Sequence, residues 1–323
     1  MKDFLGKIAV VTGGGSGMGR EIVRQLVADG CNVAMCDVSV QGMAETKRLC
    51  ESGRLLQGQR ITTHLADVSD EAQVLRFRDE VAVQQETDHI HLLFNNAGVT
   101  GGGSMFTVDR AAWDRTFAIC WGGVYHNTRA FLPMLRRSDA AHIVNTSSVN
   151  GFWASAGPYV PHTAYSAAKF AVKGFTEALI ADLRVNAPHI KCSVVMPGHI
   201  GTSILVNTRK IQSGSEAEAL SATDIVQMRR RLAALGRDVT AMSDADIERV
   251  VVERARRFRE EAPTTAEQAA TIILDGVKAD RWRILVGEDA QRLDQWVREG
   301  PEQAYDIDFY ERFATEINWQ IGR

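Results

Sequence analysis

Short apolar runs alternate with amphipathic runs along roughly the first 200 residues, and this alternation constrains the fold more than any other feature. Each apolar run is short and contains β-branched residues, as expected of a buried strand. These runs span residues 7–12, 32–36, 60–65, 90–94, 142–146 and 190–195. Between them, apolar residues recur at steps of three and four, which is typical of a helix with one buried face. The alternation predicts the doubly wound α/β fold, a parallel sheet with helices on both faces.

A glycine-rich turn follows the first strand at once. Residues 13–19 read Gly-Gly-Gly-Ser-Gly-Met-Gly, and a helical pattern begins at Ile22. Glycines permit positive φ and close approach of a ligand, and a helix N-terminus offers unpaired N–H groups and a partial positive charge. The turn therefore predicts a binding site for the pyrophosphate of a dinucleotide. The alternative is a tight turn that binds nothing.

The second strand ends in Asp37, about twenty residues beyond the glycines. A carboxylate at this point accepts hydrogen bonds from the adenosine ribose hydroxyls and repels a 2′-phosphate. Asp37 therefore predicts NAD as the cofactor and makes NADP the less favoured one. Alternatively, Asp37 is a helix N-cap, although Ser39 could also fill that role.

The fourth strand ends in Asn95-Asn96-Ala97-Gly98. Two amides and a glycine at the carboxyl edge of a parallel sheet can pin neighbouring loops and leave a flat floor for a nucleoside. Pinning of the sheet alone is the alternative, and both can hold together.

Tyr165 and Lys169 are four residues apart at the start of a helical run that extends to Asn186, so they share one face. A nearby ammonium favours the phenolate and lowers the pKa of the phenol, as a general acid/base requires. The pair alone also fits a solvated helix face. Its position after the upstream signals favours a catalytic pair.

Composition and charge exclude several other classes of protein. The formal net charge is −3 with both signs interspersed, so the sequence indicates neither nucleic acid nor an anionic membrane as a partner. The five cysteines show no Cys-x-x-Cys spacing, and His89-Ile-His91 lacks a third ligand, so we expect no disulfide framework and no metal site. With no run of about 18 apolar residues, we expect a soluble, cytoplasmic protein.

With these motifs in order, residues 5–202 resemble the short-chain dehydrogenase/reductase family. The matching motifs are Thr12-Gly-x-x-x-Gly-x-Gly19, Asp67-Val68, Asn95-Asn-Ala-Gly98, a serine after the fifth strand, Tyr165-x-x-x-Lys169 and Pro197-Gly-x-Ile-x-Thr202. Each motif is weak alone, but this many in order are specific.

The resemblance implies roles for individual residues. Tyr165 would exchange a proton with the substrate oxygen, Lys169 would assist it and hold the nicotinamide ribose, and Ser148 would hydrogen-bond the substrate oxygen. Ser148 is preferred to Ser147 because the family places its serine second in such a pair, although the gap to Tyr165 is about four residues longer than usual. The implied cofactor-binding residues are Gly13, Ser16, Gly17, Met18, Gly19, Asp37, Asp67, Val68, Asn96, Gly98, Tyr165, Lys169, Pro197, Gly198, Ile200 and Thr202.

Cys120 is the departure from the family pattern. Most members carry an asparagine at this helix position, where it holds a water in a proton relay behind the lysine. A thiol is a poor hydrogen-bond partner, and a buried cysteine usually behaves as a small hydrophobe. We therefore expect slower turnover rather than none. A dinucleotide-binding regulatory or structural protein with vestigial catalysis is the alternative function.

Beyond Thr202 we expect a single domain, residues 1–323, to be completed by three parts. Residues 203–262 would form a helical lid or, alternatively, a surface elaboration or oligomer contact. Residues 264–287 would return to the core with a seventh strand, and residues 288–323 would form a helical extension. The extension carries aromatic residues expected to pack on the core or on a partner subunit.

The expected reaction interconverts a secondary alcohol and its ketone. The apolar residues near the site, Trp153, Tyr159 and Ile204, weakly suggest a hydrophobic, cyclic or aromatic substrate. The resemblance also implies a homodimer or homotetramer.

Overall fold

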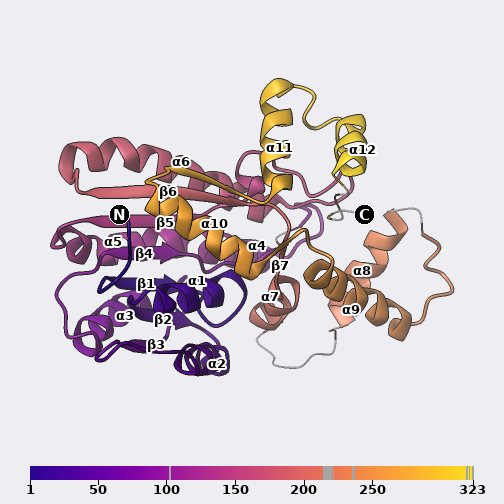
Figure 1. Cartoon of the computed structure of the whole chain (residues 1–323). Helices are drawn as coiled ribbons and strands as arrows, with labels where there is room; N and C mark the ends of the chain where they lie inside the picture. The colour runs from indigo at the N-terminus through magenta and orange to yellow at the C-terminus, as the bar shows by residue number, and fades with distance from the viewer. Residues whose placement is uncertain are drawn as a thin grey trace.

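The computed structural model describes residues 1–101, 103–213, 220, 222–234, 237–317, 319 and 321. The expected lid and extension therefore fall partly outside the described residues. Within the described part, no helix is long and apolar enough to cross a membrane. Figure 1 shows a central sheet with helices packed on both of its faces.

Seven parallel strands form that sheet, in the order β3-β2-β1-β4-β5-β6-β9. Their bounds are β1 Ile8–Thr12, β2 Asn32–Asp37, β3 Ile61–Leu65, β4 Leu92–Asn95, β5 Ala141–Thr146, β6 Ile190–Pro197 and β9 Arg283–Val286. The doubly wound fold is confirmed, including the seventh strand beyond the expected lid. Two short strands, β7 (Ile200–Gly201) and β8 (Thr264–Thr265), pair separately.

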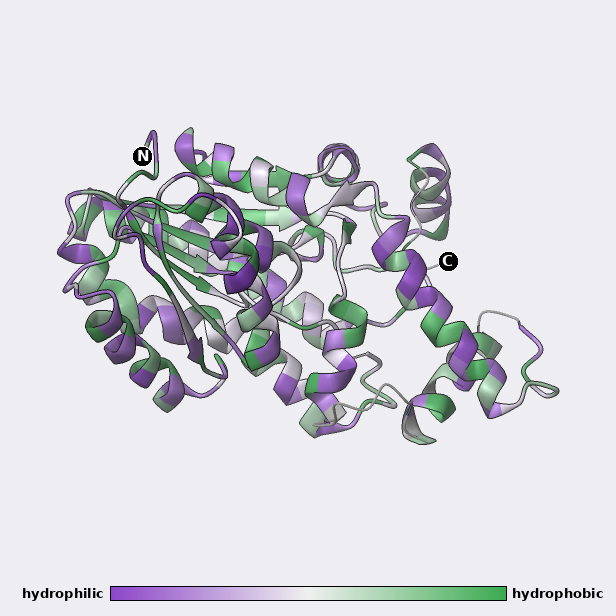
Figure 2. Ribbon diagram, turned by 60° about the horizontal axis from the view of Figure 1, so that its bottom comes forward, coloured by the Kyte–Doolittle hydropathy of each residue, from purple (hydrophilic) through white to green (hydrophobic). Residues whose placement is uncertain are grey.

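Helices cover both faces because successive strand residues point to opposite sides. Ile8 and Val10 of β1 belong to one apolar cluster, and Ala9 and Val11 belong to the other. The first face carries α3 (Glu71–Gln84), α5 (Gly123–Arg136) and α6 (Thr163–Asn186); the second carries α1 (Gly17–Ala28), α2 (Val40–Glu51) and α10 (Ala266–Lys278). Figure 2 shows hydrophobic strands between helices whose outer faces are hydrophilic.

The helix before α5 is not regular. A π-helical turn, Ala118–Gly122, joins α4 (Arg110–Phe117) to α5. Such a turn inserts an extra residue into the helix and often marks a functional site. Cys120 lies in its middle.

The described part of residues 203–262 contains three helices. They are α7 (Ile204–Ser213), α8 (Ala222–Ala234) and α9 (Asp244–Glu260). Figure 1 shows α7 beside the carboxyl ends of the strands, whereas α8 and α9 project away from the sheet. A capping box at Ser243, with Asp246 as its partner, fixes where α9 begins.

The C-terminal helices, α11 (Glu288–Glu299) and α12 (Ile307–Glu316), enclose a third apolar cluster. Trp153 belongs to this cluster and is 1% exposed. Its ring centroid lies 6.0 Å from that of Phe309 and 6.2 Å from that of Phe313. Its indole N–H donates to the Ala304 carbonyl at 2.6 Å. The structure therefore places Trp153 in a core under the extension. This position contradicts the substrate contact predicted for Trp153.

Candidate active site

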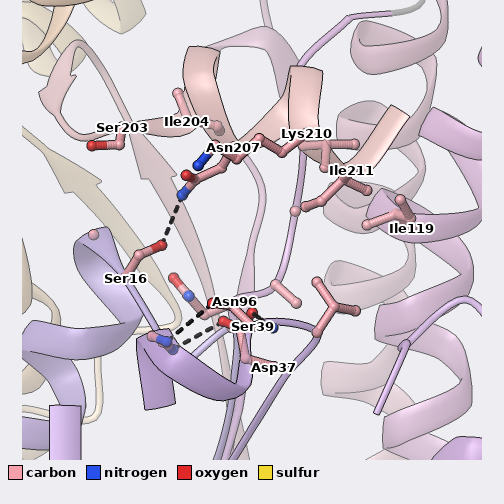
Figure 3. Close-up of a pocket in the computed structure, with 18 of the residues that line it drawn as sticks. Ser16, Asp37, Ser39, Asn96, Ile119, Ser203, Ile204, Asn207, Lys210 and Ile211 are labelled. Atoms are coloured by element: carbon pink, nitrogen blue, oxygen red, sulfur yellow. Dashed lines mark hydrogen bonds between the residues drawn. The ribbon is translucent and has the colours of Figure 1, made fainter. Parts of the chain in front are cut away.

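The polar signals at the strand ends converge on one cavity of about 640 Å³ at the carboxyl edge of the sheet. Its walls come from the glycine turn, the ends of β2, β3 and β4, and the start of the expected lid (Figure 3). Of the predicted cofactor residues, those lining the cavity are Gly13, Ser16, Gly17, Met18, Asp37, Asp67, Val68, Asn96, Gly98 and Thr202. Gly19, Tyr165, Lys169, Pro197, Gly198 and Ile200 lie outside this lining.

The glycine turn cannot carry side chains at two of its positions. Gly13 has a φ of +70°, and a Cβ there would lie 2.9 Å from the Ala97 Cα. A Cβ on Gly19 would lie 1.9 Å from the Gly13 carbonyl oxygen. The backbone packs so closely here that only glycine fits, and Gly17 and Met18 at the start of α1 line the cavity.

Asp37 is fixed by two backbone amides. Its Oδ2 accepts from the Gly15 N–H at 2.9 Å and its Oδ1 accepts from the Ser39 N–H at 2.9 Å. Ser39 itself caps α2, because its hydroxyl accepts from the Gly42 N–H. Ser39, not Asp37, is therefore the N-cap of α2. The Asp37 carboxylate lies at the cavity wall.

The Arg115 guanidinium holds Asp67, the second carboxylate expected at the adenosine end of the cofactor. Arg115 donates from Nη2 to the Asp67 Oδ2 at 2.6 Å and from Nη1 to the Ser69 hydroxyl at 2.9 Å. Burial raises the pKa of Asp67, but hydrogen bonds from Ser69 and Arg115 outweigh it and hold that pKa below its usual value. Asp67 is therefore ionised at neutral pH, and the Arg115 guanidinium forms part of the cavity wall.

Asn96 pins the turn after β4 to β1. Its backbone N–H donates to the Thr12 hydroxyl at 3.0 Å, and its Nδ2 donates to the Thr12 carbonyl at 3.2 Å. Its Oδ1 is buried without a hydrogen-bond partner in the described chain. A buried acceptor left free at a cavity wall fits a polar ligand such as a nucleotide, because leaving it unpaired would otherwise cost free energy. Together with the glycine cradle, it makes the cavity suit a dinucleotide.

Ser148, Tyr165 and Lys169 meet near the start of α6. The Ser148 hydroxyl lies close enough to the Tyr165 phenol to lower the pKa of that phenol, and the Lys169 Nζ lies 5.4 Å from the centroid of the Tyr165 ring. The Lys169 ammonium also donates to the Thr146 carbonyl at 2.8 Å. The loop after β5 and the start of α6 thus bring these three side chains together.

The electrostatics of this group differ from the expectation. Burial raises the pKa of the Tyr165 phenol, nearby Cys120 acts in the same direction, and the Ser148 hydrogen bond lowers it in part. Burial lowers the pKa of the Lys169 ammonium. The pKa of the phenol is therefore raised, whereas the sequence predicted that Lys169 would lower it.

Cys120 lies behind the same group. A Cβ on Gly98 would lie 3.6 Å from the Lys169 Nζ and 3.8 Å from the Cys120 Sγ, so these two side chains flank Gly98 together. The buried thiol donates to the Val99 carbonyl at 3.1 Å. Cys120 thus makes one weak hydrogen bond, as expected of a small, mostly apolar side chain.

The turn after β6 is held from behind by a buried carboxylate. Asp289 at the start of α11 accepts from the His199 N–H at 2.6 Å, and a Cβ on Gly198 would collide with it. Burial raises the pKa of Asp289. This support fixes the turn from which Ile200 and Thr202 continue toward α7.

The two remaining substrate candidates lie apart from each other. Ile204 lines the cavity, whereas Tyr159 is 54% exposed in the loop before α6. Ile204 keeps its predicted place at the site, and Tyr159 does not line the cavity.

Several residues of the cavity wall were missed from the sequence. Asn207, Lys210 and Ile211 come from α7, and Asn207 faces Ser16 across the cavity mouth, with its Nδ2 donating to the Ser16 hydroxyl at 3.0 Å (Figure 3). The three- and four-residue spacing of these positions could have indicated one helix face. Arg20 and Arg115 offered no comparable signal, since an arginine on an amphipathic helix is usually solvated.

Comparison with known proteins places this geometry in a family. The model for short chain dehydrogenases matches residues 7–213. The chain belongs to the short-chain dehydrogenase/reductase family. As a member of that family, it is an oxidoreductase that acts on CH–OH groups with a nicotinamide dinucleotide.

Relatives within this family share much of the chain. It is 32% identical over 298 residues to a Mycobacterium tuberculosis protein named as oxidoreductase SadH, covering 92% of each chain. It is 30% identical over 229 residues to levodione reductase of Leifsonia aquatica, covering 70% of this chain and 80% of the relative. Among solved structures, a short chain dehydrogenase/reductase from Burkholderia phymatum in complex with NAD has a TM-score of 0.71 and 26% identity, covering 100% of this chain and 99% of that one.

Proposed function

We propose that this protein is an NAD-dependent oxidoreductase that interconverts a hydrophobic secondary alcohol and its ketone. The observation that carries the proposal is the phenol of Tyr165 beside the Ser148 hydroxyl and the Lys169 ammonium. A phenol with a hydroxyl and a cation at its side suits proton exchange with an alcohol or carbonyl oxygen.

Each of the three side chains has a distinct task in this reaction. Tyr165 takes the proton from the alcohol oxygen, or returns it to the ketone oxygen in the reverse direction. Ser148 donates a hydrogen bond to that same oxygen and orients it. Lys169 favours the phenolate as charge develops on Tyr165. The nicotinamide, when bound, supplies or accepts the hydride at the carbinol carbon.

The cavity supports NAD as the dinucleotide. The glycine turn would hold the pyrophosphate, Asp67, Val68 and Asn96 the adenosine end, and Ile200 with Thr202 the nicotinamide end. Asp37 presents a carboxylate where the ribose hydroxyls would bind, and a 2′-phosphate there would meet like charge. The nearby cation of Arg20 is engaged, since its Nη2 donates to the Gly15 carbonyl at 2.6 Å and its Nε to the Thr46 hydroxyl at 3.1 Å.

The preference for NAD can be tested by titration calorimetry. Wild type should bind NAD at least about 100-fold more tightly than NADP. The repulsion between the Asp37 carboxylate and a 2′-phosphate is expected to cost about 3 kcal/mol of binding free energy. Asp37→Asn should narrow that ratio by at least about tenfold, because the variant removes the charge and retains one acceptor. Equal binding of NAD and NADP by wild type would refute the preference.

An apolar substrate is supported by the cavity wall near Gly98. Val99, Ile119, Ile204 and Ile211 line this part of the cavity with aliphatic side chains. Some relatives are named after alcohol or ketone substrates, among them levodione reductase and a D-beta-hydroxybutyrate dehydrogenase of Cupriavidus necator. Aliphatic walls exclude water and favour an apolar carbon skeleton beside the reacting oxygen.

The reaction itself is tested with NAD and a panel of hydrophobic secondary alcohols, by the absorbance of reduced nicotinamide. Wild type should turn over, and Tyr165→Phe should lose at least about 100-fold in kcat while binding NAD within about twofold of wild type. Tight NAD binding without turnover on any alcohol or ketone would instead favour a regulatory dinucleotide-binding protein.

A further inference from the structure

His162 stacks on the ring of Tyr165. The two ring centroids are 4.7 Å apart and the planes are inclined by 12°, so the rings lie nearly parallel. His162 is the N-cap residue of α6, three positions before Tyr165. No step of the proposed reaction uses it.

The imidazole also anchors the loop that follows β4. The Gly101 N–H lies 3.3 Å from the His162 Nε2, and the Thr100 hydroxyl lies 2.9 Å from the same nitrogen. A backbone N–H can only donate, so Nε2 is an acceptor and the ring proton of the neutral imidazole lies on Nδ1. His162 therefore holds the loop through one nitrogen while its face lies against the phenol ring.

The same loop is bound to α7. The Thr100 N–H donates to the Thr208 hydroxyl at 2.9 Å, and Thr208 is buried. The neighbouring residue of α7, Asn207, donates to the Ser16 hydroxyl of the glycine turn (Figure 3). A continuous set of contacts therefore runs from the glycine turn through α7 and Thr100 to His162 and the phenol.

We propose that His162 is a positioning residue for Tyr165, which fixes the phenol ring by stacking and ties its orientation to the seating of α7 over the cofactor cavity. This inference rests on the proposed function of Tyr165. Proton transfer depends steeply on donor–acceptor geometry, and a displacement of about 1 Å can cost about 100-fold in rate. The phenol oxygen lies on the χ2 axis and moves with χ1, and a parallel ring held by a loop anchor restricts motion about χ1.

Two substitutions separate the two contacts. His162→Phe keeps an aromatic ring over Tyr165 and removes the acceptor for Gly101 and Thr100. His162→Gln provides an amide oxygen as acceptor and removes the ring, and His162→Ala removes both. The matched controls are His89→Phe and His89→Gln, since His89 is a partly exposed histidine that also contacts a ring, that of His91, and lies before β4.

We expect kcat to fall about 30-fold in His162→Ala and about fivefold to tenfold in each of the other two variants, with the KM of the alcohol and the Kd of NAD within about twofold of wild type. Both His89 variants should keep wild-type kcat. A purely structural role would instead lower the melting temperature and leave kcat per folded molecule unchanged. That result, or a loss confined to KM, would overturn the proposal.

Amide hydrogen exchange tests the anchor without turnover. Exchange of the segment 99–101 and of α7 should quicken in His162→Phe and His162→Ala and stay near wild type in His162→Gln. Thr208→Val should quicken the same segment from the α7 side. Unchanged exchange in both His162→Ala and Thr208→Val would overturn the proposal. If wild type has no turnover, or Tyr165→Phe keeps it, the proposed function fails instead, and the exchange result still decides the anchor.

Discussion

Replacing Trp153 by phenylalanine should destabilise the protein strongly, even though an aromatic ring remains. The smaller ring leaves a void of roughly 40 Å³, which costs about 1 kcal/mol at ~24 cal/mol per Å³. The change also removes the N–H that donates to the Ala304 carbonyl at 2.6 Å. Leaving this buried acceptor without its donor costs about 1–3 kcal/mol, so the free energy of unfolding should fall by about 2–4 kcal/mol.

Urea denaturation followed by circular dichroism measures this difference. The matched control is Trp282→Phe, because Trp282 is 46% exposed and should change stability by less than about 0.5 kcal/mol. Equal denaturation slopes for the three proteins would show that only stability has changed. If Trp153→Phe unfolds at the same urea concentration as wild type, the third cluster does not hold the loop after Ser148 as the structure implies.

Three further outcomes are expected. Gly19→Ala should weaken NAD binding in calorimetry at least about tenfold, because its Cβ would lie 1.9 Å from the Gly13 carbonyl oxygen. The control is Gly174→Ala in α6, where a Cβ has open space and NAD binding should be unchanged. His142 is buried and burial lowers its pKa to about 4, so its neutral form stabilises the fold above about pH 6.5. That stabilisation, about 3 kcal/mol, should be lost as pH falls from 6.5 toward 4, and urea titrations of His142→Gln should show a shallower loss over this range. Cys120→Asn should match or exceed the wild-type turnover rate, because an amide can hydrogen-bond a water molecule, whereas the thiol donates to the Val99 carbonyl. A large loss of turnover in this variant would contradict the prediction.

The sequence predicted those parts of the fold and site that are encoded locally. Every strand of the main sheet was expected within one or two residues of its position, because apolar runs bounded by glycine, amide and hydroxyl residues are local signals. Asp37 and Asn96 were expected at the cavity because they directly follow strands, and the carboxyl ends of parallel strands meet at one edge.

Features that depend on distant packing could not be predicted. Trp153 was assigned a weak substrate contact because nothing near it in sequence reveals the helices that bury it. The pKa of Tyr165 was expected to fall, since the spacing to Lys169 is visible in the sequence but the burial of the phenol is not. The π-helical turn around Cys120 likewise has no signature in the local pattern.

The bond from the Trp153 indole to Ala304 spans 151 residues of chain, and this separation bears on how the protein is made. A ribosome produces the serine loop long before the helices that cover it, so the indole stays without its partners until α11 and α12 have emerged. The nascent chain would then carry an uncovered aromatic surface beside Ser148. We expect chains shortened within the last 35 or so residues to require chaperones and to aggregate, even though the nucleotide-binding half would already be complete.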